Sequence, residues 1–508
     1  MDFRLLFWYT LMFTMPIILL ISLYKPQKRR MNQQKKIPSP RKLPILGNLH
    51  QLFGDLPHYS LHNLAKEHGP LMLLQLGSIP TLVISSANIA REIFKPHDLI
   101  FSGRPELYTA KRLSYELNDI SFAPYGEYWR EVRKIAILEL LSAKRVNSFS
   151  TIRNEEVNIV INTIIRSFSS NTTINLSELM LSLANNVICR VAYGKKFDGE
   201  AKSYEILKET QTLLGELNVA DFYPWFGWLL NKVNGVDTRL EKNFKEMDEF
   251  YDEVIQEHIN GSKTTRREGE HHEDFVDVLL QLQKDPNQTV KLSDIQIKGI
   301  ITDMFIAGSD TSAATLVWIM TELIKNPSTM KKAQDELKEV VKGKQRVEES
   351  DLHKLAYLKL VIKETLRLHP PVPLLVPRET TAPCTIIGGY EIPAKTRVLI
   401  NAKAIAMDPN VWHTPNPNVF EPERFLNSSI DYKGLDFELI PFGVGRRGCP
   451  GLGFAVLLIE LALANLLYCF DWSLPKEMTR DDIDIVEAVG LTTHKKIPLC
   501  LLAAPRSL

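Results

Sequence analysis

The segment at residues 441–451 limits what this chain can fold into more than any other stretch of the sequence. It reads Pro-Phe-Gly-Val-Gly-Arg-Arg-Gly-Cys-Pro-Gly, and four glycines and two prolines in eleven residues exclude a regular helix or strand. Its cysteine, Cys449, comes shortly before an apolar run at residues 452–467 that has the composition of a helix. The backbone of this cysteine segment must therefore follow a special path that presents one cysteine at the start of a helix.

The surroundings of Cys449 favour a thiolate. Glycine amides lie around the cysteine and a helix N-terminus follows it, and both stabilise negative charge. Arg446 and Arg447 add cations that can pair with carboxylates. An anionic sulfur, hydrogen-bond donors to tune it and cations for the propionates are what a haem iron bound through cysteine needs. The alternative is a buried structural cysteine beside a glycine-rich turn, the commoner fate of a lone cysteine.

The spacing within the cysteine segment favours the haem site. The run Phe442-x-x-Gly445-x-Arg447-x-Cys449-x-Gly451 resembles, at every fixed position, the haem-binding signature of the cytochrome P-450 superfamily. The resemblance implies haem b as the cofactor and Cys449 as the ligand of its iron. It also implies that Phe442 and Arg447 contact the haem.

Two further stretches resemble haem-contacting parts of the same family. Trp129 and Arg133 are four apart in an expected helix, and therefore lie on one face. An aromatic ring beside a cation stem is common on any helix, but W-x-x-x-R in the family hydrogen-bonds a haem propionate. Residues 372–378 resemble the segment that lines the pocket and ends in a propionate-binding arginine, here Arg378.

A long apolar helix is expected between Ser293, which opens a capping box, and Asn326, which precedes a proline. It would contain about 30 residues and be about 45–50 Å long. Because it is apolar on nearly all sides, it must pass through the middle of the body. Its centre reads Ala307-Gly308-Ser309-Asp310-Thr311, which is either a packing notch with an incidental polar pair or a functional site.

That central stretch resembles the A/G-G-x-D/E-T motif of the superfamily. The resemblance implies that Ala307 and Gly308 let the helix approach the haem. It also implies that Thr311 and Asp310 are catalytic and handle the protons that dioxygen reduction requires. On a helix the side chains of adjacent residues diverge by about 100°, so Thr311 can face the haem while Asp310 faces a solvent path or a salt-bridge partner.

Glu364 and Arg367 are three apart on a helix that two prolines terminate. As an exposed pair they would contribute only tenths of a kcal/mol. The resemblance instead implies a buried E-x-x-R pair, completed by Arg424 of the Pro-Glu-Arg-Phe sequence at residues 422–425. Its role would be structural, because it fixes the chain that carries the cysteine segment.

The N-terminus carries a candidate membrane anchor. Residues 3–24 hold one charge, Arg4, and are long enough to cross a bilayer core of about 30 Å. Lysines and arginines follow, which places that side in the cytosol. A cleaved signal peptide is the alternative, but no small-residue cleavage site precedes the basic cluster. We expect an anchor at residues 1–24, a basic and proline-rich hinge at 25–48 and a catalytic domain at 49–508.

Bulk properties exclude several other classes of protein. With 508 residues, 44% of them apolar, the chain is ample for a large core, and a net charge of +1 gives no reason to expect nucleic acid as a partner. Five scattered cysteines imply no disulfide framework. Residues 261–274 are expected to form an exposed loop, in which the adjacent His271 and His272 make a poor metal pair. Residues 71–84 are typical of a β-hairpin with a turn at 77–80.

The motifs occur in family order, and the resemblance covers essentially the whole chain. It is closest to plant microsomal enzymes of the A-type clan. It implies a mostly α-helical fold with a small β-rich lobe, preceded by a single transmembrane helix in the endoplasmic reticulum with the catalytic domain cytosolic. It also implies electrons from NADPH through NADPH–cytochrome P-450 reductase, and insertion of one oxygen atom from O2 into a small apolar metabolite such as a terpenoid or alkaloid. The expected substrate-pocket residues are Ile120, Ala307, Val372, Val376, Ala488 and Val489.

Other outcomes of a haem-thiolate protein are alternatives. A reductase-independent isomerase or dehydratase rearranges peroxides, but those relatives depart from the helix motif and alter the cysteine loop, and both are intact here. A non-enzymatic haem sensor has no use for Asp310 and Thr311. Oxidative ring coupling and desaturation use the same radical chemistry, and no residue excludes them.

Overall fold

The computed structural model describes residues 36–170, 172–196, 200–261, 273–288, 291–413 and 416–506. The expected membrane anchor at residues 1–24 lies outside these ranges, as do His271, His272 and most of the loop expected at residues 261–274. The expected hinge at residues 25–48 is described from residue 36 onward.

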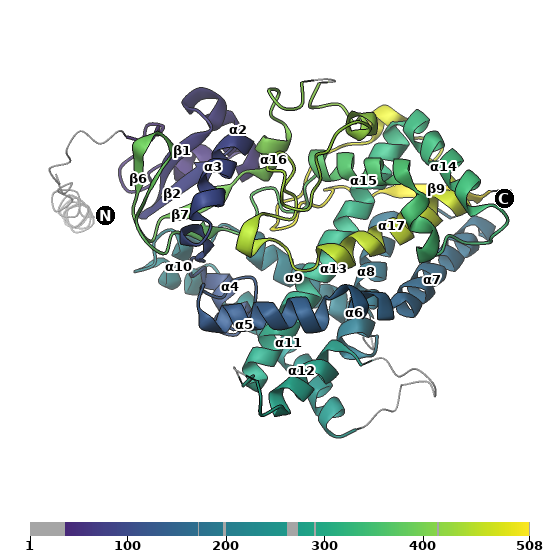
Figure 1. Ribbon diagram of the computed structural model, residues 1–508, viewed down its shortest axis with the longest axis horizontal. Coiled ribbons are helices and arrows are strands. Elements are labelled where there is room, and N and C mark those ends of the chain that lie inside the picture. The colour runs from purple at the N-terminus through teal and green to yellow at the C-terminus, as the bar shows by residue number, and fades with distance from the viewer. Residues whose placement is uncertain are drawn as a thin grey trace, which may run out of the picture.

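Helices form most of the described fold, and short strands gather mainly at one side of it (Figure 1). The α-helices are α2 (Pro57–His68), α3 (Ala87–His97), α4 (Tyr108–Leu113), α5 (Glu127–Ile135), α6 (Ala143–Ser148), α7 (Ser150–Ser169), α8 (Leu176–Tyr193), α9 (Glu200–Gly215), α10 (Gly227–Val233), α11 (Val236–Ile259), α12 (Phe275–Lys284), α13 (Asp294–Lys325), α14 (Pro327–Val341), α15 (Ala356–Leu368), α16 (Ala402–Ala406) and α17 (Leu452–Cys469). The strands are β1 (Leu71–Leu76), β2 (Ile79–Ile84), β3 (Ile174–Asn175), β4 (Arg378–Glu379), β5 (Cys384–Ile386), β6 (Tyr390–Ile392), β7 (Arg397–Ile400), β8 (Phe470–Ser473) and β9 (Cys500–Pro505). The prediction of a mostly α fold with a small β-rich lobe is confirmed.

The β-rich lobe is built around a four-stranded sheet in the order β1-β2-β7-β4. β1 and β2 form the predicted hairpin, with Leu71 opposite Ile84 and Leu76 opposite Ile79. The turn is shorter than predicted, because β2 begins at Ile79 and Pro80 lies within the strand. β7 joins β2 in parallel, and β4 adds antiparallel to β7, so the sheet carries Arg378 at its edge.

The predicted central helix is α13, which spans 32 residues and ends one residue before Asn326. Ser293 caps its N-terminus, and its hydroxyl and the Gln296 side chain form the predicted capping box. Most of its residues are buried, because it packs against α8 on one side and α17 and α15 on others. A helix with this much apolar surface is stable only inside the body, which is where Figure 1 places α13.

The helix after the cysteine segment, α17, is a second core helix. Within the described part of the chain it is the one helix that length and composition would allow to cross a membrane, and 72% of it is buried inside the protein. We therefore treat α17 as part of the core. It packs on α13, α14 and α7, which fixes its N-terminus beside the middle of the molecule.

Part of the expected hinge is attached to the β-rich lobe. The N–H of Leu73 donates to the carbonyl of Pro38 at 2.9 Å, and the side chain of Asn48 accepts the N–H of Gln75 at 2.9 Å. Asn48 is fully buried. The last residues of the hinge are therefore hydrogen-bonded to β1 and form part of the body.

Candidate active site

The cysteine segment folds back on itself in front of α17. The N–H of Cys449 donates to the carbonyl of Phe442 at 2.8 Å, and the N–H of Gly448 donates to the carbonyl of Gly445 at 3.0 Å. Gly445 has a φ of +62°, and a Cβ at this position would lie 2.4 Å from Oδ1 of Asp98. Only glycine fits this turn, which explains one fixed position of the motif in steric terms.

The sulfur of Cys449 faces a central cavity of the protein. Burial raises the pKa of this thiol, and the N–H of Gly451, the charge of Arg133 and the N–H of Leu452 lower it without cancelling the effect of burial. The two N–H groups belong to the start of α17, whose dipole adds to the positive potential at the sulfur. Because metal ligation requires the thiolate, binding of a metal here would release the thiol proton.

Four arginines from four different parts of the chain line the same central cavity, and three of them are buried. They are Arg104, Arg133, Arg378 and Arg447. Arg447 donates to the carbonyls of Ser102 and Ala123 at 2.8 and 2.7 Å, and its guanidinium lies 4.1 Å from the centre of the Trp129 ring. The Trp129 indole N–H in turn donates to the carbonyl of Ile120 at 2.9 Å.

The charges of these arginines are poorly compensated. Within the described residues, no acidic side chain forms an ion pair with Arg104, Arg133 or Arg447, whereas Arg378 has Asp98 at 3.4 Å. Burial, followed by repulsion from Arg378, lowers the pKa of Arg447 to about 9. Burial lowers the pKa of Arg378 to about 10, and burial also lowers the pKa of Arg104 well below its ordinary value.

The nearest acids do not neutralise this group of cations. Oδ2 of Asp303 accepts the backbone N–H groups of Ile120 and Ser121 at 2.6 and 3.1 Å, and Asp119 accepts those of Phe122 and Ala123. Burial raises the pKa of both acids. A set of buried cations with so little anionic compensation fits an anionic group in the cavity, as two propionates would supply.

Helix α13 forms another wall of the central cavity through Ala307, Gly308 and Thr311. The Thr311 hydroxyl donates to the carbonyl of Ala307 at 2.9 Å, within the same helix. A Cβ on Gly308 would lie 2.5 Å from Cδ1 of Ile188 on α8. Close packing of α13 on α8 therefore accounts for this glycine. This contact agrees with the alternative that the stretch is a packing notch.

Asp310 does not line the central cavity. It is 3% exposed, and its Oδ1 lies 2.8 Å from Nε2 of His494. Its other oxygen, Oδ2, is buried and has no hydrogen-bond partner among the described residues. The divergence expected between adjacent helix positions thus separates Thr311, on the cavity side, from Asp310, beside a histidine that no motif had indicated.

The six expected substrate-pocket residues divide between two cavities. Ile120, Ala307, Val372 and Val376 line the central cavity. The other two, Ala488 and Val489, line a neighbouring cavity of about 850 Å³, which shares Val372 and Leu375 with the central one. The structure therefore places Ala488 and Val489 at the neighbouring cavity, and they are not among the residues that line the central one.

The E-x-x-R cluster lies apart from the central cavity and is fully buried. Arg367 donates to both oxygens of Glu364 at 2.8 Å, and Arg424 donates to Oε1 of Glu364 at 2.9 Å. Arg367 also donates to the carbonyls of Ala406 and Pro417 at 2.9 and 2.8 Å. These bonds connect α15 to the chain that leads to the cysteine segment, as the resemblance implied.

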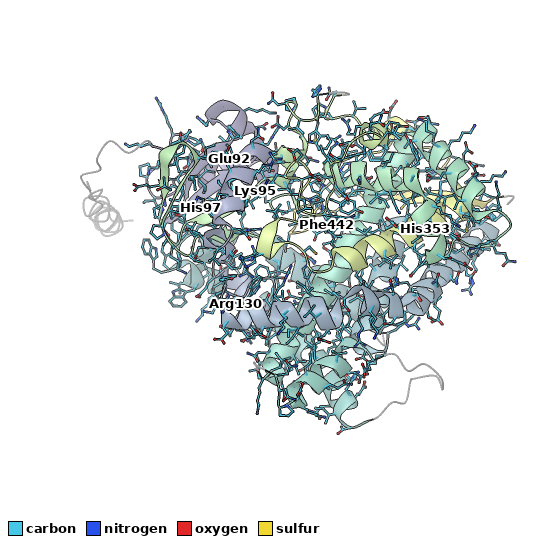
Figure 2. The ribbon with its side chains drawn as sticks, in the orientation of Figure 1. Glu92, Lys95, His97, Arg130, His353 and Phe442 are labelled. Atoms are coloured by element: carbon cyan, nitrogen blue, oxygen red, sulfur yellow. The ribbon has the colours of Figure 1, made fainter. Side chains whose placement is uncertain are left out.

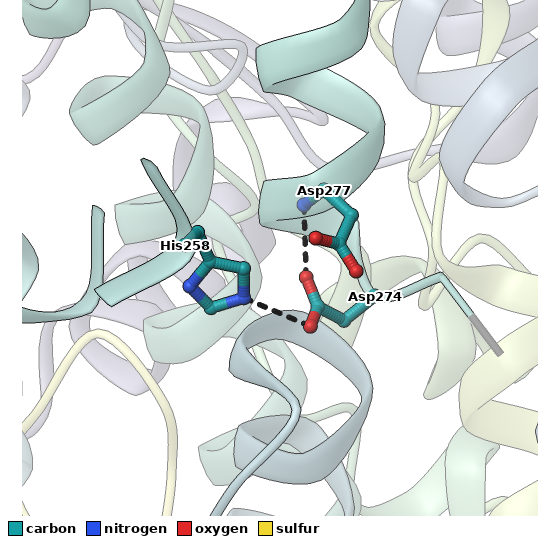
Figure 3. Close-up of side chains that lie close together, drawn as sticks. All are labelled: His258, Asp274 and Asp277. Atoms are coloured by element: carbon teal, nitrogen blue, oxygen red, sulfur yellow. Dashed lines mark hydrogen bonds and ion pairs between the residues drawn. The ribbon is translucent and has the colours of Figure 1, made fainter. Parts of the chain in front are cut away.

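A second cluster has the composition of a metal site. The ligand atoms of His258, Asp274 and Asp277 lie within 4.8 Å of one another (Figure 3). Asp274 caps α12 through the N–H of Asp277 at 2.9 Å, and its other oxygen pairs with His258 at 2.9 Å. Helix capping and an ion pair account for this arrangement, so we assign no metal to it.

Sequence reasoning missed two residues of the site. Arg104 stands between a glycine and a proline and belongs to no motif considered above, yet it donates to the carbonyls of Val376 and Pro377 at 2.6 and 2.8 Å. His494 lies in a polar run, Thr-Thr-His-Lys-Lys, that reads as ordinary surface sequence. In both cases the only sequence signal is a charged or titratable residue inside a loop.

Comparison with known proteins assigns this site to a family. The model of the family described as "Cytochrome P450" matches residues 37–501. The chain is 58% identical to "Cytochrome P450 71A9" of Glycine max over 99% of both chains. It is 56% identical to "Strychnine-11-hydroxylase" of Strychnos nux-vomica over 99% of this chain and 98% of that one. A zebra fish cytochrome P450 solved with progesterone superposes with a TM-score of 0.74 at 26% identity, covering 89% of this chain and 100% of that one.

Proposed function

The chain belongs to the cytochrome P450 family, and we propose that it inserts one oxygen atom from O2 into a small apolar alkaloid or terpenoid. The observation that carries the proposal is the shared cavity: the Cys449 sulfur and Thr311 face it, and buried arginines surround it. A relative with 56% identity is named as a hydroxylase of strychnine, an alkaloid, which supports that substrate class.

The cofactor of the family is haem b, and the residues of the central cavity fit it. Cys449 would ligate the iron, and Arg133, Arg378, Arg447 and Trp129 would hold the propionates, as the motifs implied. Arg104 joins this set, because it is buried beside Arg378 and Arg447 and lacks an acidic partner. When bound, the haem supplies the activation of O2, with electrons that originate from NADPH.

The residues of the chain itself would have three roles: stabilising the thiolate, delivering protons and orienting the substrate. The N–H groups of Gly451 and Leu452 and the charge of Arg133 stabilise the Cys449 thiolate. The Thr311 hydroxyl, free to turn away from the Ala307 carbonyl, delivers protons at the cavity wall. Asp310, the preceding residue of α13, supplies Thr311 with protons from outside the central cavity. Apolar side chains of the central cavity exclude water and orient the substrate.

We propose NADPH–cytochrome P-450 reductase as the electron donor, bound over the face that carries the cysteine segment. In the view of Figure 2, Phe442 lies near the middle, with Lys95 and His97 of α3 on one side and Arg130 of α5 below them. Lys95, Arg130 and Arg446 are exposed. Exposed cations beside the iron ligand suit an acidic redox partner, because complementary charge steers association.

We propose that the body rests on the cytosolic face of the endoplasmic reticulum membrane. An exposed apolar group on and before α10 supports this: Trp225 is 72% and Val233 80% exposed, and Trp228 and Leu229 are also exposed. The Tyr223 hydroxyl ties this region to the carbonyl of Ile45 in the hinge at 3.1 Å. A glycan on any of the sequons at Asn171, Asn175, Asn260, Asn287 or Asn427 in microsomes would contradict this orientation.

The experiment is a microsomal assay of the full chain with reductase, NADPH and a panel of alkaloids and terpenoids, analysed by product mass. A gain of one oxygen atom, dependent on both reductase and NADPH, is the expected result. Loss of two hydrogens, or a coupled ring without added oxygen, would instead indicate desaturation or ring coupling. Turnover without reductase would indicate an isomerase or dehydratase.

The iron ligand is tested by Cys449→Ser, because a hydroxyl cannot replace the thiolate as a strong donor. We expect loss of turnover and of the red-shifted Soret band of the ferrous–CO complex. Cys384→Ser is the matched control, since Cys384 lies in β5 and does not line the central cavity. Retention of the band in Cys449→Ser would show that another residue ligates the iron.

A further inference from the structure

The acid on α13 has a partner that lies 184 residues further along the chain. Nε2 of His494 is 2.8 Å from Oδ1 of Asp310. The side chain of His494 is 35% exposed, whereas that of Asp310 is 4% exposed. The pair therefore connects a buried carboxylate, one residue before Thr311, to the surface of the protein.

Electrostatic support of a buried acid is the first explanation for such a pair, since an unpaired buried carboxylate is costly. It accounts for only one of the two oxygens. Oδ2 of Asp310 has no partner among the described residues, whereas both oxygens of the structural acid Glu364 accept hydrogen bonds. The unoccupied oxygen can receive a proton and pass it on.

The backbone around His494 is fixed by contacts that do not involve its ring. The carbonyl of Thr493 accepts the indole N–H of Trp318 at 2.9 Å, and the N–H of Thr493 donates to the carbonyl of Pro371 at 2.8 Å. Trp318 lies on α13 about two turns after Asp310. The same helix thus positions both members of the pair, and replacing the imidazole leaves these anchors intact.

We propose that His494 collects protons from solvent and gives them to Asp310, which passes them to Thr311. The proposal rests on the proposed monooxygenase function, because dioxygen reduction in the central cavity is what consumes the protons. His494 acts through Asp310 and is a positioning and relay residue. It does not touch the substrate.

Each transfer moves one proton and leaves the electron pair behind. The Nε2–H bond of the imidazolium breaks and an O–H bond forms on Oδ1 of Asp310. The neutral ring then turns its bare Nε2 toward solvent and regains a proton there, which restores the imidazolium. The carboxylic acid then gives its proton to the Thr311 oxygen, after side-chain rotation or through one water. Thr311 releases its own hydroxyl proton into the cavity as it receives this one, so the chain returns to its starting state.

The charges around the pair favour the imidazolium. Burial lowers the pKa of His494, but the charge and hydrogen bond of Asp310 outweigh it, and the pKa is raised above its ordinary value of 6.5. Glu178 on α8 and Tyr204 on α9 lie on the Asp310 side. Burial raises the pKa of Tyr204, and the charges of Glu178 and Asp310 raise it further. Of the adjacent lysines, Lys495 pairs with Asp484 at 2.5 Å and Lys496 follows it. The imidazolium of His494 therefore persists to a higher pH than that of an ordinary histidine, and it is lost as the pH rises through the raised pKa.

The first measurement tests the pair itself and requires no substrate. In the full-length holoenzyme with ¹³C-labelled histidine, the resonance lost in His494→Gln identifies His494. We expect it to titrate above pH 6.5 in the unmodified enzyme and at lower pH in Asp310→Asn, because the carboxylate charge is gone. An identical titration in the two proteins would show that the pair does not form in solution, which would overturn the proposal.

The second measurement tests the relay through the hydrogen peroxide released per NADPH consumed, with reductase present, across pH 6–9. His494→Gln keeps an N–H donor for Oδ1 of Asp310 but cannot titrate, and His494→Ala removes the donor altogether. We expect both variants to form about tenfold less product per NADPH, which is less than the 10²–10⁴-fold that positioned proton transfer typically contributes, because water substitutes in part. In the unmodified enzyme we expect the ratio of hydrogen peroxide released to NADPH consumed to rise with pH, because the imidazolium is lost. In both variants we expect this ratio to be high and independent of pH.

His258→Gln is the matched control. His258 forms a similar pair with Asp274 at 2.9 Å, and its pKa is also raised because that acid outweighs burial. Neither residue lines the central cavity. We expect no change in the ratio of hydrogen peroxide to NADPH in this variant, so a general effect of losing one histidine pair is separated from the relay.

The outcomes separate the relay from a structural role. If His494→Gln matches the unmodified enzyme in the peroxide ratio and its pH dependence, the pair only supports a buried charge and the proposal is wrong. If the unmodified enzyme consumes no NADPH with reductase, the proposed function fails and the relay fails with it. The NMR titration would still show in that case whether the pair exists, so the two failures are distinguishable.

Discussion

Two buried carboxylates of this protein, Glu364 and Asp310, have opposite surroundings. Glu364 is fully buried, and its oxygens accept two hydrogen bonds from Arg367, one from Arg424 and one from a backbone N–H. Asp310 is almost as buried but pairs with one partly exposed histidine, His494, and keeps one oxygen without a partner. The first acid is enclosed by permanent cations, whereas the second faces a histidine, which can gain and lose a proton.

This difference separates a structural from a chemical role. A carboxylate whose two oxygens both accept hydrogen bonds from arginines is held as the anion, and its network fixes the positions of the chain segments it joins. A buried oxygen without a partner is rare in folded proteins and requires an explanation. The proton transfer that we propose would explain it for Asp310. The predictions below test this contrast through stability, from the largest expected effect to the smallest.

The largest loss of stability is expected for Glu364→Gln. The amide cannot compensate Arg367 and Arg424, and removing one partner of a buried ion pair typically lowers the free energy of unfolding by about 3–5 kcal/mol. We expect little holoenzyme, measured by haem content and the ferrous–CO band after expression. Glu349→Gln is the control, because Glu349 also pairs with a buried arginine, Arg153 at 2.6 Å, but is itself partly exposed. A variant with wild-type haem content would contradict the structural role of Glu364.

A smaller loss is expected for Glu487→Gln. Glu487 accepts from His58 at 2.7 Å and from Lys403 at 3.3 Å. Burial raises its pKa, but the His58 hydrogen bond and the charge of Lys403 outweigh burial and lower it to about 2. A shift of this size from the ordinary 4.5 corresponds to about 3 kcal/mol of stability.

The pH dependence of that loss follows from the direction of the shift. Because the folded pKa is depressed, the stabilisation is complete above pH 4.5 and disappears as the pH falls through about 2. Thermal unfolding should therefore show the same destabilisation at pH 7 and pH 5 and a smaller one at pH 3. Glu348→Gln, which removes an exposed pair with Lys344, should show no such change. A destabilisation that grows on the acid side would contradict this assignment.

The stabilisation by the Asp310–His494 pair has the opposite pH dependence. Because the pKa of His494 is raised, this stabilisation is lost on the alkaline side.

The sequence predicts those parts of the fold and site whose determinants are local. Ser293 caps α13 and the helix ends beside Asn326, as propensity and capping chemistry require. The turn of the cysteine segment is equally local, because Gly445 has a φ of +62°, which favours glycine, although the side chain that a Cβ there would meet, Asp98, lies far earlier in the chain. The E-x-x-R cluster was also predictable, since its motifs resemble those of a known family.

Contacts between distant segments explain what the sequence does not predict. Arg104 and His494 reach the site from loops, and nothing near them in the sequence indicates which carbonyl or carboxylate they meet. Ala488 and Val489 were assigned by position in the family, but they line the neighbouring cavity. Gly308 illustrates a different limit: its motif predicts a functional role, while its steric environment is the side chain of Ile188 on α8.

The smallest change in stability is expected for Thr311→Ala. This variant is also the clearest test of the proposed proton route through Asp310 and Thr311. The Thr311 hydroxyl donates only to the carbonyl of Ala307, which also accepts within the helix, so its loss removes little. Haem content, substrate binding and unfolding should be nearly unchanged. Product formed per NADPH consumed should fall, and hydrogen peroxide per NADPH should rise. Positioned proton transfer typically contributes about 10²–10⁴-fold in rate, and the fall in product should be smaller than this because water can deliver part of the protons. Thr315→Ala is the matched control, because Thr315 makes the same type of bond one turn later, to the carbonyl of Thr311 at 2.8 Å, and does not line the central cavity. An unchanged ratio of product to NADPH in Thr311→Ala would make Thr311 a packing residue and leave the unpaired oxygen of Asp310 without a recipient for its proton.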